Sequence, residues 1–385
     1  MFNNHRTPSF EDKFMALGFS NNCTSQAPAN SSEYAHHYPP EKPMLKHILT
    51  LLAFIIVFNS NLIASELRVF FVDVEGGAAT LIVTPAGESL LIDCGNPGKR
   101  DAERIHKVAT EKAGIKAIDH LFITHWHLDH YGGAERLRSL MPIHNFWDRG
   151  IPETLPEDAK NFPILIQAYK AAGGDKSKTL KAGDEVPLKQ LAGAPKLKLS
   201  VLSASGQVLK DKPGAPENPI AKQHQPRPED NSDNAKSLGF LLQFGEWKFL
   251  DLGDLTWNIE YKLVHPTDKI GKIDVYQTTH HGLEISNNPV VINTVEPRVA
   301  IFNNGSKKGC HPQVTGALRR VQGLEAIFQV HRNINAGPGE NTEPSNIANE
   351  GEECSAETVV LTVGKDAKSY TVQAGKNKPK DFKTR

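Results

Sequence analysis

The chain has 385 residues, enough for about two or three domains of ordinary size or for one large domain with additions. Hydrophobic residues make up 39% and charged residues 23%, a balance that excludes a disordered chain, collagen and a polytopic membrane protein. The net charge of zero argues against a bulk electrostatic nucleic-acid binder, and four cysteines without a C-x-x-C pair exclude a disulfide scaffold and a zinc ribbon.

The N-terminal 65 residues are predicted to lie outside the folded domain. Residues 1–43 are polar and irregular, and we interpret them as an extension upstream of Met44, which stands where an initiator would stand. Residues 44–65 combine a basic start, an apolar run and small residues at Ala64 and Ser65, the layout of a signal peptide. A membrane anchor formed by residues 48–63 is the alternative. Both interpretations predict export of the domain, to the periplasm or out of the cell.

After Glu66 the sequence predicts an α/β domain over residues 66–375. Ten prolines between residues 151 and 234 indicate an irregular insertion with one helix near 156–172, a few strands and a long loop at 210–234. Residues 376–385 are predicted to form a basic tail. Hairpins alternating with βα units indicate two mixed sheets with helices outside. The predicted strands are 67–74, 79–83, 89–92, 120–124, 238–244, 247–250, 273–277, 298–302, 358–363 and 369–372, and the predicted helices are 100–113, 134–140 and 312–321.

The chemistry is concentrated in one motif, which follows a buried strand. His125, His127, Asp129 and His130 place three imidazoles and a carboxylate within six positions. In an extended segment His125 and His127 point to one side and can chelate one ion, whereas Asp129 and His130 lie on the following turn and face a second position. Imidazole and carboxylate ligands together suit Zn²⁺, with Mn²⁺ or Fe²⁺ as alternatives.

This motif resembles the H-x-H-x-D-H signature of the metallo-β-lactamase superfamily. Further matches run from residue 67 to 335: Asp93 at a strand end, an N-x-x-S-L segment from Asn234, a G-D element with Asp254, and an H-H-G element with His280 and His281. Their order is most similar to the soluble hydrolase domain of bacterial competence (DNA-internalisation) proteins and its stand-alone relatives. The resemblance implies an αββα four-layer sandwich and two divalent metal ions.

The resemblance also implies roles for these residues. His125 and His127 would bind one ion, Asp129, His130 and His280 the other, and Asp254 would bridge the two. A water between the ions would become the nucleophile, with Asp129 serving both metal binding and catalysis. His281 would donate a hydrogen bond to the substrate or protonate the leaving group. Asp93 and Asn234 would lie beside the ligands and orient them.

Two departures from the family pattern concern this site. Ala78 stands where the family often has an aspartate, and no G-H-T-x-G element supplies a third histidine for the first metal. Candidates for the missing ligand are His224, Asp233 and Asn234.

The predicted function is therefore hydrolysis of a phosphoester or phosphodiester by an exported metallo-hydrolase. Hydrolysis of a lactone or a β-lactam is a second hypothesis, and a metal-stabilised binding module without turnover is a third. The expected partner is a small-molecule or phosphodiester substrate. A nucleic acid is an open possibility, and no obligate protein partner is evident.

Overall fold

The computed structural model describes residues 66–351 and 354–385. The predicted extension and the signal peptide or anchor lie outside these residues. In the described part, no helix combines the length and the apolar character needed to cross a bilayer.

The first sheet has nine strands in the order β18-β17-β16-β1-β2-β3-β4-β5-β6. Its β3, β4, β5 and β6 run parallel, whereas the remaining neighbours pair antiparallel. The bounds are β1 Leu67–Phe71, β2 Thr80–Val83, β3 Ser89–Ile92, β4 Ile118–Phe122, β5 Ile143–Asp148, β6 Lys178–Thr179, β16 Val359–Val363, β17 Ser369–Ala374 and β18 Lys380–Lys383.

The second sheet has the order β15-β14-β13-β12-β11-β10-β8-β7, with β9 paired to β8. Here β11 to β15 run parallel, and β10 joins β11 in an antiparallel hairpin. The bounds are β7 Glu185–Val186, β8 Leu197–Ala204, β9 Gln207–Val208, β10 Gly239–Phe244, β11 Trp247–Asp251, β12 Val275–Gln277, β13 Val299–Phe302, β14 Ala326–His331 and β15 Ile347–Asn349.

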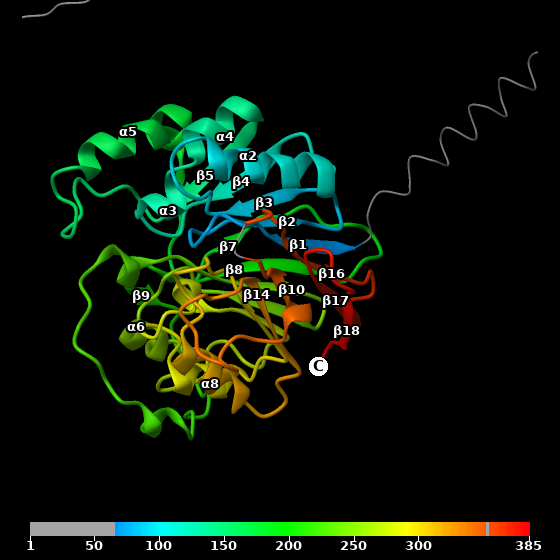
Figure 1. Ribbon diagram of the computed structural model, residues 1–385. Coiled ribbons are helices and arrows are strands. Elements are labelled where there is room, and N and C mark those ends of the chain that lie inside the picture. The colour runs from blue at the N-terminus through cyan, green and yellow to red at the C-terminus, as the bar shows by residue number, and fades with distance from the viewer. Residues whose placement is uncertain (1–65, 352–353) are drawn as a thin grey trace, which may run out of the picture. The chain divides into compact units, whose positions relative to one another are not determined.

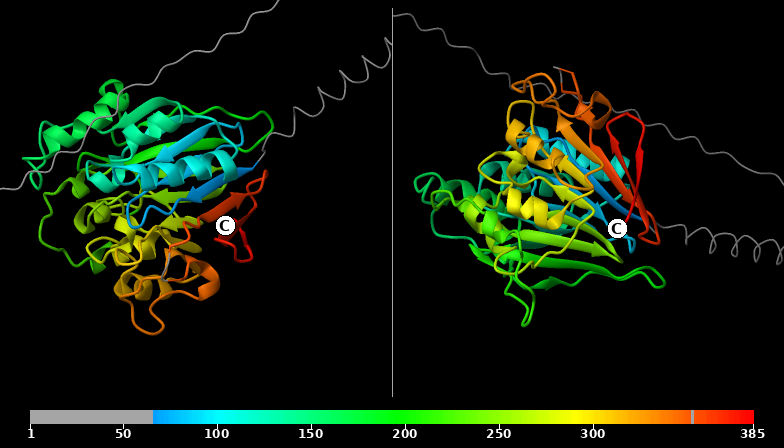
Figure 2. Two further views of the ribbon diagram at one scale, coloured as in Figure 1. Left: turned by 45° about the horizontal axis from the view of Figure 1, so that its top comes forward. Right: turned by 90° about the horizontal axis from the view of Figure 1, so that it is seen from below.

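Helices cover the outer faces of both sheets (Figures 1 and 2). Apolar side chains of α2, α4 and α5 pack on the first sheet, and those of α7 and α8, with α6 beside them, pack on the second. The bounds are α2 Lys99–Lys107, its π-helical continuation η1 Val108–Lys112, α3 Leu128–Tyr131, α4 Ala134–Leu140, α5 Phe162–Ala172, α6 Trp257–Lys262, α7 Pro289–Val295 and α8 Pro312–Arg319, with short 3-10 turns η2 Gly174–Lys176, η3 Ala221–Gln223, η4 Asp233–Lys236, η5 Thr279–Gly282 and η6 Pro344–Asn346.

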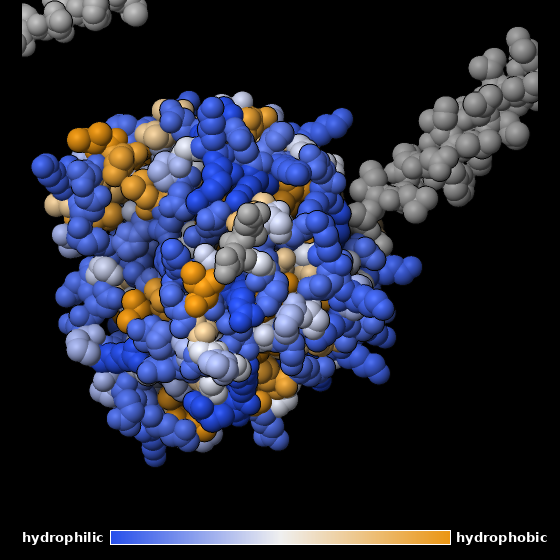
Figure 3. Space-filling model, in the orientation of Figure 1, coloured by the Kyte–Doolittle hydropathy of each residue, from blue (hydrophilic) through white to orange (hydrophobic). Residues whose placement is uncertain are grey.

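A third apolar core lies between the two sheets and contains side chains from both. Phe71 of β1 and Phe249 of β11 meet edge to face at 5.9 Å, and Phe122 of β4 meets Phe240 of β10 at 5.4 Å. The order helices, sheet, sheet, helices confirms the αββα sandwich expected from the sequence. The face seen in Figure 3 is mainly hydrophilic, with scattered apolar residues.

Two segment predictions differ from the structure. The region 151–234 is only partly an insertion, because β6 extends the first sheet and β7 and β8 extend the second. The basic end is no separate tail, because β18 pairs with β17. Phe382 of β18 is buried and stacks on Tyr370 with ring centroids 5.2 Å apart. This buried aromatic ring joins the C-terminal end to the core.

Candidate metal centre

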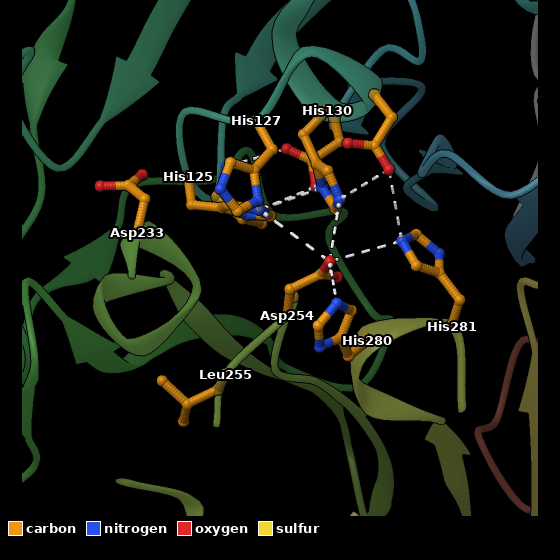
Figure 4. Close-up of polar contacts among 12 residues, drawn as sticks. His125, His127, His130, Asp233, Asp254, Leu255, His280 and His281 are labelled. Atoms are coloured by element: carbon orange, nitrogen blue, oxygen red, sulfur yellow. Dashed lines mark hydrogen bonds and ion pairs between the residues drawn. The ribbon is translucent and has the colours of Figure 1, made fainter. Parts of the chain in front are cut away.

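The candidate residues follow the carboxyl ends of parallel strands. Asp93 comes directly after β3, the segment 124–131 comes after β4, Asp254 comes after β11, and His280 and His281 come after β12. The carboxyl ends of parallel strands meet at one edge of a sheet, which is where α/β folds commonly bind ligands. Figure 4 shows the side chains from these loops converging.

Asp254 lies at the centre of this group and is 2% exposed. Its Oδ2 is 3.2 Å from His130 Nε2, 3.3 Å from His280 Nε2, 3.4 Å from His281 Nε2 and 3.9 Å from His125 Nε2. Four imidazole nitrogens thus surround one carboxylate oxygen. A single oxygen cannot accept hydrogen bonds from all four.

His125 and His127 face each other across a shared position, with His125 Nε2 3.1 Å from His127 Nδ1. The other ring nitrogen of His127 lies 2.9 Å from a carboxylate oxygen of Glu157. Because a carboxylate only accepts, His127 Nε2 carries the proton and Nδ1 keeps its lone pair.

Asp93 fixes the protonation of two further histidines. Its Oδ2 lies 2.7 Å from His130 Nδ1 and accepts a 2.8 Å hydrogen bond from Thr124 Oγ1. Since the Thr124 hydroxyl donates to Asp93, its oxygen accepts from His125 Nδ1 at 3.0 Å. Both histidines therefore direct Nε2 toward Asp254. In a neutral ring this nitrogen carries the lone pair, because Nδ1 carries the proton.

The same arrangement holds for the two histidines after β12. His281 Nδ1 lies 3.3 Å from the Asn303 carbonyl oxygen, so His281 Nδ1 donates. Ser286 Oγ donates to the Leu255 carbonyl at 2.7 Å and lies 3.4 Å from His280 Nδ1. The Nε2 atoms of both rings consequently face the carboxylates.

These residues fit divalent cations. The Nε2 atoms of His130 and His281 are buried and, among the described residues, have no hydrogen-bond partner. Buried imidazole nitrogens without a partner are costly unless a ligand satisfies them. Two groups of three side chains each have their ligand atoms within 4.8 Å of one another. One group is His125, His130 and Asp254, and the other is Asp129, His130 and His281. Imidazole and carboxylate are the ligands that Zn²⁺ prefers.

The local backbone brings these groups close together. Asp93, His280 and His281 have φ values of 59°, 54° and 55°, in the left-handed region. Gly253, just before Asp254, has φ +55°, and a Cβ there would lie 2.9 Å from Thr124 Cβ. Glycine therefore allows the loop after β11 to pack against the loop after β4.

Burial and neighbouring charges shift the pKa values of the histidines in opposite directions. Burial alone would lower the pKa of His130, but Asp254, Asp93 and Asp129 raise that pKa well above its usual range. Burial lowers the pKa of His280 to about 4 despite the attraction of Asp254. Burial and the neighbouring His130 hold the pKa of His125 well below its usual range. The carboxylates thus favour the protonated form of His130 in the metal-free protein, whereas burial favours the neutral forms of His125 and His280.

We expect zinc binding to release this proton. Charged His130 stabilises the metal-free fold fully below its unfolded pKa of about 6.5, and this stabilisation is lost as the pH rises through the higher folded value. Because a metal ligand must be neutral, zinc affinity should increase with pH. Calorimetric titration of zinc at pH 7 in buffers of different ionisation enthalpy measures the release directly. A binding enthalpy independent of the buffer would contradict it.

Glu157 is a positioning residue that the sequence reasoning missed. Its Oε1 contacts His127 Nε2 and also accepts from the Asp233 backbone N–H at 2.6 Å. We expect Glu157→Gln to lower zinc affinity by roughly tenfold, because the amide no longer fixes the His127 tautomer. Chelator competition measures this affinity. Glu153→Gln, at an exposed position on the same loop, is the matched control, and equal affinities in the two variants would exclude the role.

His224 and Asp233, two of the candidates for a missing third ligand, make their contacts outside the group of histidines around Asp254. The His224 ring stacks on Tyr261 with centroids 3.8 Å apart, and its Nδ1 lies 3.0 Å from Asn288 Nδ2. Asp233 lies apart from the cluster in Figure 4, where its Oδ2 accepts from the Trp126 backbone N–H at 2.6 Å. Asn234 follows Asp233 in the same turn, η4, and is also buried.

Lys308 is the second residue that the sequence did not single out. Its Nζ lies 2.5 Å from Asp129 Oδ2. The segment around Lys308 is rich in glycine and lysine and is typical of a solvated loop, so no sequence signal marks this lysine or Glu157.

The chain is similar to known proteins of one superfamily. Residues 72–216 match the family model described as metallo-beta-lactamase superfamily. The chain contains a metallo-beta-lactamase superfamily domain. The matched span includes Asp93 and all of the His125–His130 motif. The resemblance read from these residues is thereby confirmed.

Two curated relatives are similar to the chain. It is 26% identical to ComE operon protein 3 of Bacillus subtilis over 209 residues, 54% of this chain and 23% of that protein. It is 26% identical to Recombination protein 2 of Haemophilus influenzae over 259 residues, 67% of this chain and 26% of that protein. The chain thus spans about a quarter of the length of these relatives. Among solved structures, the metallo-beta-lactamase fold protein YhfI from Bacillus subtilis is 12% identical, with a TM-score of 0.40 over 68% of this chain and 96% of that one.

Proposed function

We propose that the domain is a metal-dependent hydrolase that cleaves phosphoesters or phosphodiesters with two divalent cations, zinc first among them. The observation that carries the proposal is the set of imidazole nitrogens facing Asp254, each ring held by an acceptor on its far side. The cations would lower the pKa of a water and polarise a phosphoryl oxygen.

We assign His125 and His127 to one cation and Asp129, His130 and His281 to the other, with Asp254 shared. His281 Nε2 lies 3.7 Å from Asp129 Oδ2, so His281 is placed with these ligands. This differs from the proton-donor role expected from the sequence, because Nδ1 holds the His281 proton on the side away from the site. For His280, whose Nε2 lies 3.3 Å from Asp254 Oδ2, we keep the role expected from the sequence, a ligand of the same cation as Asp129 and His130.

The other residues prepare the site. Asp93 and Thr124 hold the rings of His125 and His130, and Glu157 holds that of His127. Asp233 fixes the backbone of the motif at Trp126. Asp254 and His125 are buried, and electrostatic interactions are stronger where water is excluded.

Substrate assays test the proposal. Metal-depleted protein, alone and with added Zn²⁺ or Mn²⁺, is tested with bis-p-nitrophenyl phosphate, a chromogenic β-lactam and a lactone. We expect metal-dependent hydrolysis of the phosphodiester and little of the others. Preferential cleavage of the lactam or lactone would overturn the substrate class. Two bound metal equivalents without any turnover would favour the binding module.

We further propose that the domain is exported. The support is the basic, apolar and small-residue pattern of residues 44–65. Separation of cells into periplasmic, secreted and membrane fractions tests this localisation and distinguishes cleavage from anchoring by residues 48–63. Recovery of the full chain in the cytosol would contradict export.

A further inference from the structure

Lys308 places a positive charge at the rim of the metal centre. Its side chain is 40% exposed, and its Nζ lies 2.5 Å from Asp129 Oδ2. The same oxygen lies 3.7 Å from His281 Nε2 and 3.8 Å from His130 Nε2. The ammonium therefore reaches from the solvent side to the carboxylate that faces these two histidines.

The backbone that carries Lys308 is fixed relative to the site. The next residue is Gly309, where a Cβ would lie 2.1 Å from the His281 carbonyl oxygen, and the Cys310 N–H donates to that oxygen at 2.8 Å. Asn333 Nδ2 donates to the carbonyls of Gly309 and Cys310 at 3.1 and 3.2 Å. Only the flexible side chain of Lys308 can change its position without disturbing His281.

A cation on Asp129 would change the surroundings of this lysine. The cation would bind the same Oδ2 atom and would repel the ammonium. Metal binding and the Lys308–Asp129 ion pair therefore compete. The released ammonium has three donors and lies beside the position where a substrate would meet the metals. An anionic phosphoryl oxygen supplies the charge complement for it, whereas a neutral ester does not.

We propose that Lys308 anchors the anionic group of the substrate and thereby selects phosphate esters over neutral esters, and that in the metal-free protein the same lysine holds Asp129. This inference rests on the proposed function and names a residue that determines its specificity. It makes two predictions of opposite sign: loss of the ammonium strengthens metal binding and weakens anion binding.

Lys308→Met tests both predictions, with Lys307→Met as the matched control at an adjacent exposed lysine. We expect zinc affinity, from chelator competition, to rise several-fold in Lys308→Met. The affinity of the zinc-loaded protein for inorganic phosphate, from calorimetry, should fall about tenfold. Both values should stay unchanged in Lys307→Met, and Lys308→Arg should restore phosphate binding.

Neither measurement requires turnover, so the inference can fail separately from the proposed function. Weaker zinc binding in Lys308→Met would show a merely structural role for the lysine. Unchanged phosphate affinity would show that Lys308 does not bind the anion. If the protein hydrolyses phosphodiesters, Lys308→Met should raise KM for bis-p-nitrophenyl phosphate about tenfold with kcat within about twofold. An unchanged KM would also overturn the inference.

Discussion

An Asp254→Asn variant should hydrolyse bis-p-nitrophenyl phosphate about 10³-fold more slowly than the unaltered protein while keeping its fold. The amide has the shape of the carboxylate but not its charge. The charge offsets the repulsion between two nearby cations and sets the positions of four histidines around Asp254 Oδ2. Loss of metal-supplied stabilisation of several kcal/mol corresponds to about three orders of magnitude in rate.

The measurement for Asp254→Asn combines initial rates, bound zinc by elemental analysis and circular dichroism. Zinc content should fall below two equivalents while the spectrum stays unchanged. Asp381→Asn, at an exposed position of β18, is the control and should retain full activity. An Asp254→Asn variant as active as this control would remove Asp254 from the mechanism.

Asp93→Asn should have the largest effect on stability. Asp93 is 1% exposed and accepts from the Thr124 N–H at 2.8 Å, from the Thr124 hydroxyl and from His130 Nδ1. An amide accepts at one of its two terminal atoms, so at least one donor loses its partner. Breaking such a buried charged network costs about 3–5 kcal/mol. Asparagine tolerates the left-handed backbone at this position, so backbone strain does not confuse the result.

Urea denaturation of the metal-free protein measures this cost, and chelator competition measures the accompanying loss of zinc affinity. The loss should be about 10- to 100-fold, because the rings of His130 and His125 lose their fixed orientation. Asp175→Asn, at an exposed position, serves as the control. Asp93→Asn with unaltered stability and unaltered zinc affinity would show that Asp93 does not support these ligands.

The sequence pointed to the candidate centre because its residues fall in recognisable patterns at strand ends. Three histidines and an aspartate in six positions follow an apolar strand, and the elements around Asp254 and His280 stand in the order of the family. Hairpins alternating with βα units indicated two mixed sheets with helices outside, and the family resemblance implied the αββα order of the layers. These signals are local, and each can be read within about ten residues.

The remaining parts depend on tertiary contacts that no local pattern reveals. Glu157 and Lys308 lie in loops of ordinary polar composition, and only the fold brings them to His127 and Asp129. The sequence predicts no strand at β5, β14, β15 or β18, and it predicts β6 to β9 only as a few strands without bounds. Several of these strands have two to four residues, too few to show a periodic pattern. The proposed ligand role of His281 beside His280 depends on left-handed backbone angles, which the sequence His-His-Gly does not determine.

Anomalous X-ray diffraction at the zinc edge tests the central claim most directly, with crystals of zinc-loaded protein. We predict two peaks about 3.5–4 Å apart, one beside His125 and His127, the other beside Asp129, His130 and His281, with Asp254 between them. Zinc peaks elsewhere on the molecule, with none at Asp254, would contradict the account.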